Sequence, residues 1–129
     1  MKTKTTIVLF IGLGLLFNQA SASAHHATAA QYDISKTVMF KGVITKLDWA
    51  NPHIHVYMDV KGENDRRESW NVEFASPGGV IVAGLTKDLL KAGTRIAIKG
   101  YPSKSAAQSA CATEVTFPDG TTVHFVVGI

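Results

Sequence analysis

The chain has 129 residues, of which 46% are hydrophobic and 18% are charged, and its formal net charge is +3. This length is enough for one compact domain with a hydrophobic core, and it leaves no room for a second. Cys111 is the single cysteine, which excludes an internal disulfide. Its alternating context, ACATEVTF, predicts a small buried side chain, with intermolecular pairing or metal ligation as the alternatives.

The start of the chain has the three parts of a secretory signal peptide. Two lysines precede an apolar stretch over 7–17, and the small-residue motif Ala-Ser-Ala ends at Ala24. The apolar stretch has about half of the ~20 residues that a helix needs to cross a bilayer. We therefore predict a signal peptide over 1–24, cleavage that leaves residues 25–129, and a periplasmic or secreted protein without a membrane span. Cleavage after Ala22 is the alternative.

The charge balance of the predicted mature chain is almost neutral. Removal of the first segment leaves 11 basic and 10 acidic residues. Nucleic-acid binders need a clustered basic surface that displaces counterions from phosphates. Neutrality and export together predict that the partner is an unknown periplasmic ligand or protein and that nucleic acid is excluded.

The first half of the predicted mature chain is typical of three strands. Residues 37–49 are rich in β-branched and aromatic side chains, and Gly42 interrupts their alternation, which predicts a bulge. Residues 53–60 alternate strictly between polar and apolar side chains. A polar turn over 61–67 leads to a third strand over 69–75. The second and third strands are therefore expected to form a hairpin.

The second half contains a break, short helical segments and further strands. The run Ser-Pro-Gly-Gly at 76–79 breaks the sheet, and a short buried helix or loop follows it up to Gly84. Thr86 is typical of an N-cap and Gly93 of a helix stop, which predicts a helical turn between them. The later strands are expected over 94–101, 110–117 and 121–127.

This succession of three strands, a short helix and further strands is the order of the oligonucleotide/oligosaccharide-binding (OB) barrel. We predict an all-β fold: a small OB-like Greek-key barrel with one short helix between strands 3 and 4, forming a single domain over 25–129. The side chains expected in its core are Val38, Phe40, Val56, Met58, Trp70, Val72, Phe74, Ile96, Ile98, Val115 and Phe117.

Two stretches of the chain, AHHATAAQYD at 24–33 and KGVITKLDWANPH at 41–53, carry a resemblance to a known family. They resemble small exported bacterial proteins of unknown function, whose mature chains begin with His-His and contain a Trp-x-Asn-Pro-His strand motif. Trp70 and Gly93 also match, whereas Ala27 stands where the family usually has serine and the helix region lacks the expected arginines. The resemblance implies the barrel and the exported location. It implies no established activity.

Four histidines are predicted to form one metal site. Signal cleavage gives His25 a free amino group beside its ring, and His26 follows it. His53 and His55 are two residues apart on a strand, so they share a face. Nitrogen donors suit copper, zinc or nickel, and copper fits the periplasm best. We therefore predict a copper-binding protein, in which the hairpin register places Glu73 opposite His55, where its carboxylate can orient a ligating imidazole.

Other interpretations of the same residues stay open. The N-terminal histidines could be a leader left by cleavage, and the strand histidines an ordinary polar face. A barrel that binds a small molecule, glycan or partner protein without metal is the alternative function. Its surface would be the outward face of the second and third strands, with Trp49, Asn51, Tyr57, Asn71 and Glu73 as contacts. Nucleophile and phosphate-loop motifs are scarce, which favours a binding protein over an enzyme. The one catalytic alternative is a copper oxygenase built on an N-terminal histidine chelate.

Overall fold

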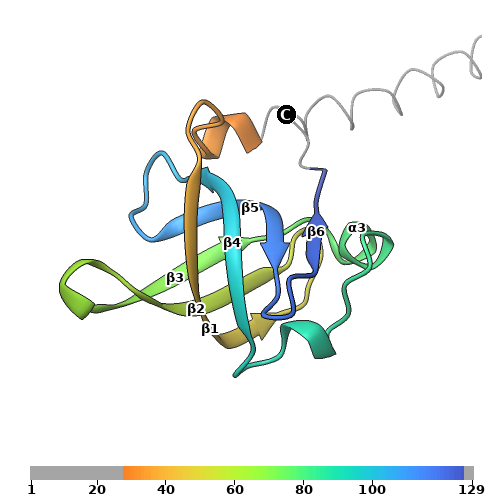
Figure 1. Cartoon of the computed structure of the whole chain (residues 1–129). Coiled ribbons are helices and arrows are strands. Elements are labelled where there is room, and N and C mark those ends of the chain that lie inside the picture. The colour runs from red at the N-terminus through yellow and green to blue at the C-terminus, as the bar shows by residue number, and fades with distance from the viewer. Residues whose placement is uncertain (1–27, 127–129) are drawn as a thin grey trace, which may run out of the picture.

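The computed structural model describes residues 28–126. The predicted signal peptide, its cleavage site, His25 and His26 lie outside these residues. Six strands dominate the fold (Figure 1), namely β1 Val38–Asp48, β2 His55–Lys61, β3 Arg67–Glu73, β4 Arg95–Pro102, β5 Ser109–Thr116 and β6 Thr122–His124. The named helical segments are η1 Glu63–Asp65, α3 Pro77–Val82 and η2 Asp88–Leu90. No helix in the described part of the chain is long and apolar enough to cross a membrane.

Strands β1 to β5 close into a barrel. β1 pairs antiparallel with both β2 and β4, β2 pairs with β3, and β4 pairs with β5. A parallel pairing between β3 and β5 joins the two sides of this sheet and completes the ring. β6 extends the sheet beyond β5 as a short hairpin strand. This arrangement confirms the predicted all-β, OB-like barrel.

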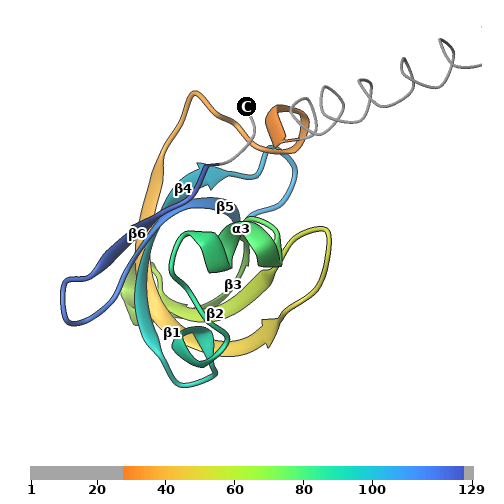
Figure 2. The same ribbon diagram turned by 90° about the vertical axis from the view of Figure 1, so that its right-hand side faces the viewer.

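α3 follows β3 in the chain, as expected, and lies across one opening of the barrel (Figure 2). The Ser76 hydroxyl caps this helix by accepting a hydrogen bond of 3.2 Å from the backbone N–H three residues on, and Val80 points into the core. The second expected helical turn is the 3₁₀ segment η2, but Thr86 is not its N-cap. Lys87 occupies that position, and its side chain makes no capping hydrogen bond.

The bulge expected at Gly42 lies a few residues later in β1. The register between β1 and β2 shifts between Ile44 and Lys46, whereas Gly42 itself is regularly paired with β2 and β4 at once. A Cβ added at Gly42 would collide with the carbonyl oxygen of Asp59. A glycine within a strand indicates either a bulge or a close backbone approach, and here it permits the approach.

Most of the predicted core side chains are buried. Those at most 3% exposed are Val56, Met58, Val72, Phe74, Ile96, Ile98 and Val115. Val38, Phe40, Trp70 and Phe117 are only partly buried. The rings of Phe40 and Trp70 pack on each other at the edge of the core, with centroids 4.2 Å apart, which leaves part of each ring in solvent. Cys111 is buried, as its alternating context predicts.

Candidate functional site

The hairpin of β2 and β3 presents polar side chains along its outward face. His55 lies opposite Glu73 and Tyr57 opposite Asn71, which is the register expected from the sequence. The seventh and last residue pair between β2 and β3, at the hairpin tip, consists of the basic residues Lys61 and Arg67. The two ends of one hairpin therefore carry different chemistry, and each end has a hollow beside it.

Glu73 is the centre of the polar cluster at the first end. Its Oε1 lies 2.8 Å from Nδ1 of His53, and its Oε2 accepts a hydrogen bond of 2.6 Å from the Tyr32 hydroxyl. The Glu73 side chain is 14% exposed, whereas that of His53 is 45% exposed. A carboxylate bound through both oxygens fixes the orientation of the imidazole beside it.

His55 is oriented in a similar way by an amide. Its Nδ1 lies 3.0 Å from Oδ1 of Asn71, and because a carbonyl oxygen only accepts, the imidazole donates from Nδ1. The Nδ1 of His53 likewise faces an acceptor, the carboxylate of Glu73. With Nδ1 protonated, the lone pair on Nε2 of each ring is left for another ligand. This arrangement is typical of histidines that coordinate a metal.

The segment that precedes β1 is attached to the same end of the hairpin. Residues 28–31 are helical, and Tyr32 forms an isolated β-bridge with Ser103 in the loop between β4 and β5. The backbone N–H of Lys104 donates to the Gln31 carbonyl at 3.0 Å. A small cavity of about 150 Å³ is lined by Thr28, Gln31, His53 and Glu73. The start of the described chain therefore lies beside His53.

Two further groups near Glu73 are held in their neutral forms. Burial, reinforced by the hydrogen bond to Glu73, raises the pKa of the Tyr32 phenol far above its ordinary value of 10.0. Burial, with the negative charge of Glu73 as a second cause, raises the pKa of Cys111 to about 12. Tyr32 therefore remains a hydrogen-bond donor, and the protonated, buried thiol of Cys111 is typical of a structural cysteine.

The structure does not gather all of the proposed ligand-face residues. Tyr57 is half-buried on the outward face, with the Lys46 ammonium 5.1 Å from its ring centroid. Asn51 is exposed in the loop between β1 and β2. Trp49 packs against the hydrophobic core instead, and the Lys87 ammonium lies 5.7 Å from its ring centroid.

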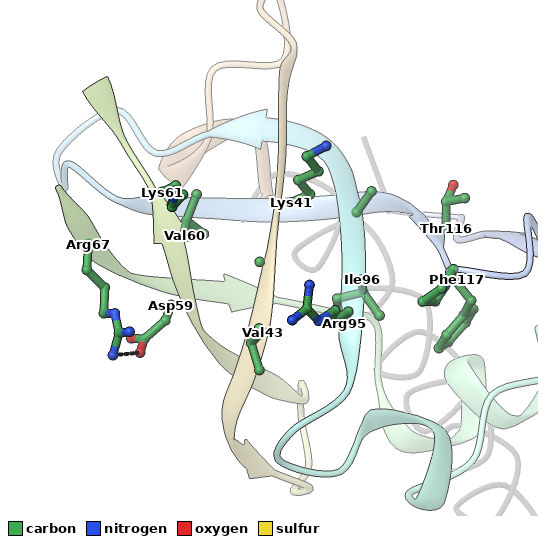
Figure 3. A pocket seen from close by; sticks show the side chains of 13 residues that line it. Lys41, Val43, Asp59, Val60, Lys61, Arg67, Arg95, Ile96, Thr116 and Phe117 are labelled. Carbon is green, nitrogen blue, oxygen red and sulfur yellow. Dashed lines mark ion pairs between the residues drawn. The ribbon is translucent and has the colours of Figure 1, made fainter. Parts of the chain in front are cut away.

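A larger groove, which sequence reasoning missed, lies at the other end of the hairpin (Figure 3). It has a volume of about 710 Å³, and its walls come from β1, the β2–β3 tip, the start of β4 and the turn after β5. Its charged lining residues are Lys41, Lys61, Arg67, Arg95 and Asp59. These residues are far apart in the chain, so no local spacing connects them. Only the polar alternation of each strand indicated an outward face.

The fold defines the class of protein as a small OB-type barrel. The sequence also identifies the family of the protein, because a family model matches residues 14–112. The chain belongs to the family of unknown function DUF6152. The expectation of a family without an assigned activity is confirmed, and export and the His-His motif remain predictions. No curated protein matches the sequence.

Solved structures with a similar fold include a mitochondrial protein and a protein from Thermoanaerobacter tencongensis. One is the mitochondrial single-stranded DNA binding protein Rim1 from S. cerevisiae, with a TM-score of 0.49 and 7% identity over 64% of this chain and 93% of that one. The other is the N-terminal domain of PriB from Thermoanaerobacter tencongensis, with a TM-score of 0.47 and 16% identity over 64% of this chain and 94% of that one. These similarities concern the fold.

The exclusion of nucleic acid from the possible partners is corrected by this finding. Rim1, a protein with a similar fold, is described as a single-stranded DNA binding protein. The physical reason for the error is that net charge averages over the whole surface. Four basic side chains line one groove here, although the predicted mature chain carries 11 basic and 10 acidic residues and is close to neutral.

Proposed function

We propose that the protein is an exported metal-binding protein that holds one copper ion through His25, His26, His53 and His55. The observation that carries the proposal is the pair of oriented imidazoles on the β2–β3 hairpin. Each has an oxygen acceptor at Nδ1, within 2.8 Å for His53 and 3.0 Å for His55. Outer partners of this kind set the tautomer and orientation of metal-binding histidines.

The position of the first described residues supports a contribution from the N-terminal histidines. Thr28 lines the cavity that contains His53 and Glu73. His26 precedes Thr28 by two residues, a stretch of chain that spans at most about 7 Å. Within residues 28–126, no three His, Cys, Asp or Glu side chains form a group that could hold a metal. Further donors from residues 25 and 26 would complete the coordination of the two hairpin histidines.

The residues present fit copper by their chemistry. Imidazole nitrogens and a terminal amine suit Cu(II), whereas calcium and magnesium prefer oxygen ligands. In this proposal Glu73 binds no metal and positions the ring of His53, while Asn71 positions that of His55. A metal and a proton compete for the same ring nitrogens, so affinity falls as the pH is lowered from about 7 to about 5.

The test is calorimetric titration of Cu(II) into the untagged protein that begins at His25. One tight site is expected, and the double change His53→Ala, His55→Ala should weaken binding more than about a hundredfold. One residue added before His25 removes the free amine from this histidine and should also weaken binding strongly. His124→Ala is the matched control, because His124 is an exposed histidine with its own carboxylate, Glu114, at 3.3 Å.

Either of two results would refute the metal site. One is the absence of a tight site in the untagged protein. The other is unchanged affinity after both the extension and the double substitution. The outward face around Tyr57 and Asn71 would then be tested as a metal-free surface for a small molecule, glycan or protein.

A further inference from the structure

The groove at the tip end of the hairpin combines an apolar floor with basic walls. Val43, Val60, Ile96 and Phe117 contribute the apolar surface, and Figure 3 shows Phe117 and Ile96 on the side of β4 and β5. Val60 and Ile96 are buried, at 5% and 3% exposed, whereas Val43 and Phe117 are only partly buried and provide the apolar surface that a ligand can reach. The groove is therefore hydrophobic at its base and open above it.

Two of the four cations in the groove have carboxylate partners. The Lys61 ammonium lies 3.1 Å from Asp65, and the guanidinium of Arg67 lies 3.4 Å from Asp59. The other two, Lys41 and Arg95, have no ion pair within residues 28–126 and are exposed.

Lys41 and Arg95 are close enough to act together. In the antiparallel pairing of β1 with β4, Lys41 lies opposite Ala97 and Val43 opposite Arg95. Lys41 and Arg95 are therefore diagonal neighbours, with their Cβ atoms about 7–8 Å apart on one face of the sheet. Both long side chains can reach a single anionic group placed between them, and such a group would relieve their mutual repulsion.

The dimensions and charges of the groove select among possible ligands. A volume of about 710 Å³ falls in the ordinary range for small organic ligands and is far larger than an inorganic anion needs. A neutral apolar ligand would leave both cations unpaired.

We propose that this groove binds a small, soluble amphipathic anion. Its apolar body lies on Val43 and Phe117, and its carboxylate, sulfonate or phosphate group pairs with Lys41 and Arg95. The site is separate from the histidine cluster, because Lys61 lies six residues along β2 from His55, a distance of about 20 Å. The proposal is therefore independent of copper binding.

A pair of fluorescent probes with the same apolar body tests the proposal. 8-Anilino-1-naphthalenesulfonate carries a sulfonate, and N-phenyl-1-naphthylamine lacks it. The sulfonate probe should bind at one site and more tightly, and added salt should weaken its binding alone. The double change Lys41→Gln, Arg95→Gln should lower its affinity roughly three- to tenfold and leave the uncharged probe unaffected.

The matched control is Lys91→Gln with Lys99→Gln, which removes two exposed positive charges outside the groove. It should leave both probes unaffected, and circular dichroism should show that both double variants are folded. Equal binding of the two probes, or equal loss in the control, would overturn the proposal. Competition by inorganic phosphate as strong as by decanoate would overturn the amphipathic ligand, and binding restricted to anionic lipid vesicles would overturn the soluble one.

Discussion

The two ends of the β2–β3 hairpin differ in how their charged groups are stabilised. At the His55–Glu73 end, the carboxylate is bound through both oxygens and a segment from before β1 is attached beside it. At the Lys61–Arg67 end, the ion pairs involve lysine and arginine side chains that are 79% and 80% exposed. The first end can therefore hold a rigid geometry, whereas the second can adapt to a ligand. One regular ladder thus supports both a positioned site and an open one.

The largest expected effect is a loss of stability of the whole barrel, on which both ends of the hairpin depend. Phe74 is 1% exposed, and its ring lies 5.2 Å from that of Phe125. Phe74→Ala should lower the free energy of unfolding by about 3–5 kcal/mol, because it leaves a cavity in the core. Urea denaturation measures this loss. Phe117→Ala, at a partly buried position, should cost clearly less, and an equal cost would show that the core does not end where the structure places it.

Removing the charge of Glu73 should affect only the first end. Glu73→Gln weakens the hydrogen bonds to Tyr32 and His53 and should cost about 1–3 kcal/mol of stability. Copper affinity should fall about 10- to 100-fold, and binding of the sulfonate probe should stay the same. Glu114→Gln, which removes the carboxylate beside His124, is the control for both measurements. Copper affinity that is equal in the two variants would separate Glu73 from the metal site.

Alkaline pH should release the attachment of Tyr32. The pKa of this phenol is raised in the folded protein, so the stability it provides is complete below its ordinary value of 10.0 and is lost as the pH rises above that value. Tyr32→Phe should lower stability by about 1 kcal/mol at pH 7 and flatten the loss between about pH 9 and 11. Thermal unfolding across this range, with Tyr57→Phe as control, measures both. If Tyr32→Phe loses stability with rising pH as steeply as the unchanged protein, the Tyr32 phenol does not cause the alkaline loss.

The smallest effect is expected at the hairpin tip. Arg67→Gln breaks the exposed pair with Asp59 and should change stability by less than about 0.5 kcal/mol, because solvent screens such pairs. Chemical denaturation at low and high salt checks this expectation. A change as large as that for Glu73→Gln would show that the two ends are equally ordered.

The register of the hairpin could be predicted from the sequence, but the contacts that other segments make with the hairpin could not. Strict alternation along β2 and a polar turn are local signals, and they correctly place His55 opposite Glu73. The contacts of Glu73 with His53 and Tyr32 depend on how a segment before β1 meets the loop after β4. No periodicity within one segment contains that information.

The basic groove could not be predicted for a related reason. Lys41 and Arg95 become neighbours only because β1 pairs with β4 as well as with β2. The order of strands along the chain allows this pairing, but it does not determine which residues lie opposite each other. Gly42 is a second example of a feature that the sequence shows but cannot explain. Its interruption of the pattern was visible, yet whether it indicated a bulge or a close approach depended on the Asp59 carbonyl of the neighbouring strand.

The parallel contact between β3 and β5 also determines when the fold can form. It pairs Asn71 with Ser109, so the ring cannot close until β5 is available, near the end of the chain. Contacts between such distant segments are formed slowly, because a long loop must first be ordered. A chain cut before β5 would expose the unpaired edges of both β3 and β4, which invite intermolecular strand pairing. Translation that stops early should therefore give an aggregating fragment rather than a smaller working barrel.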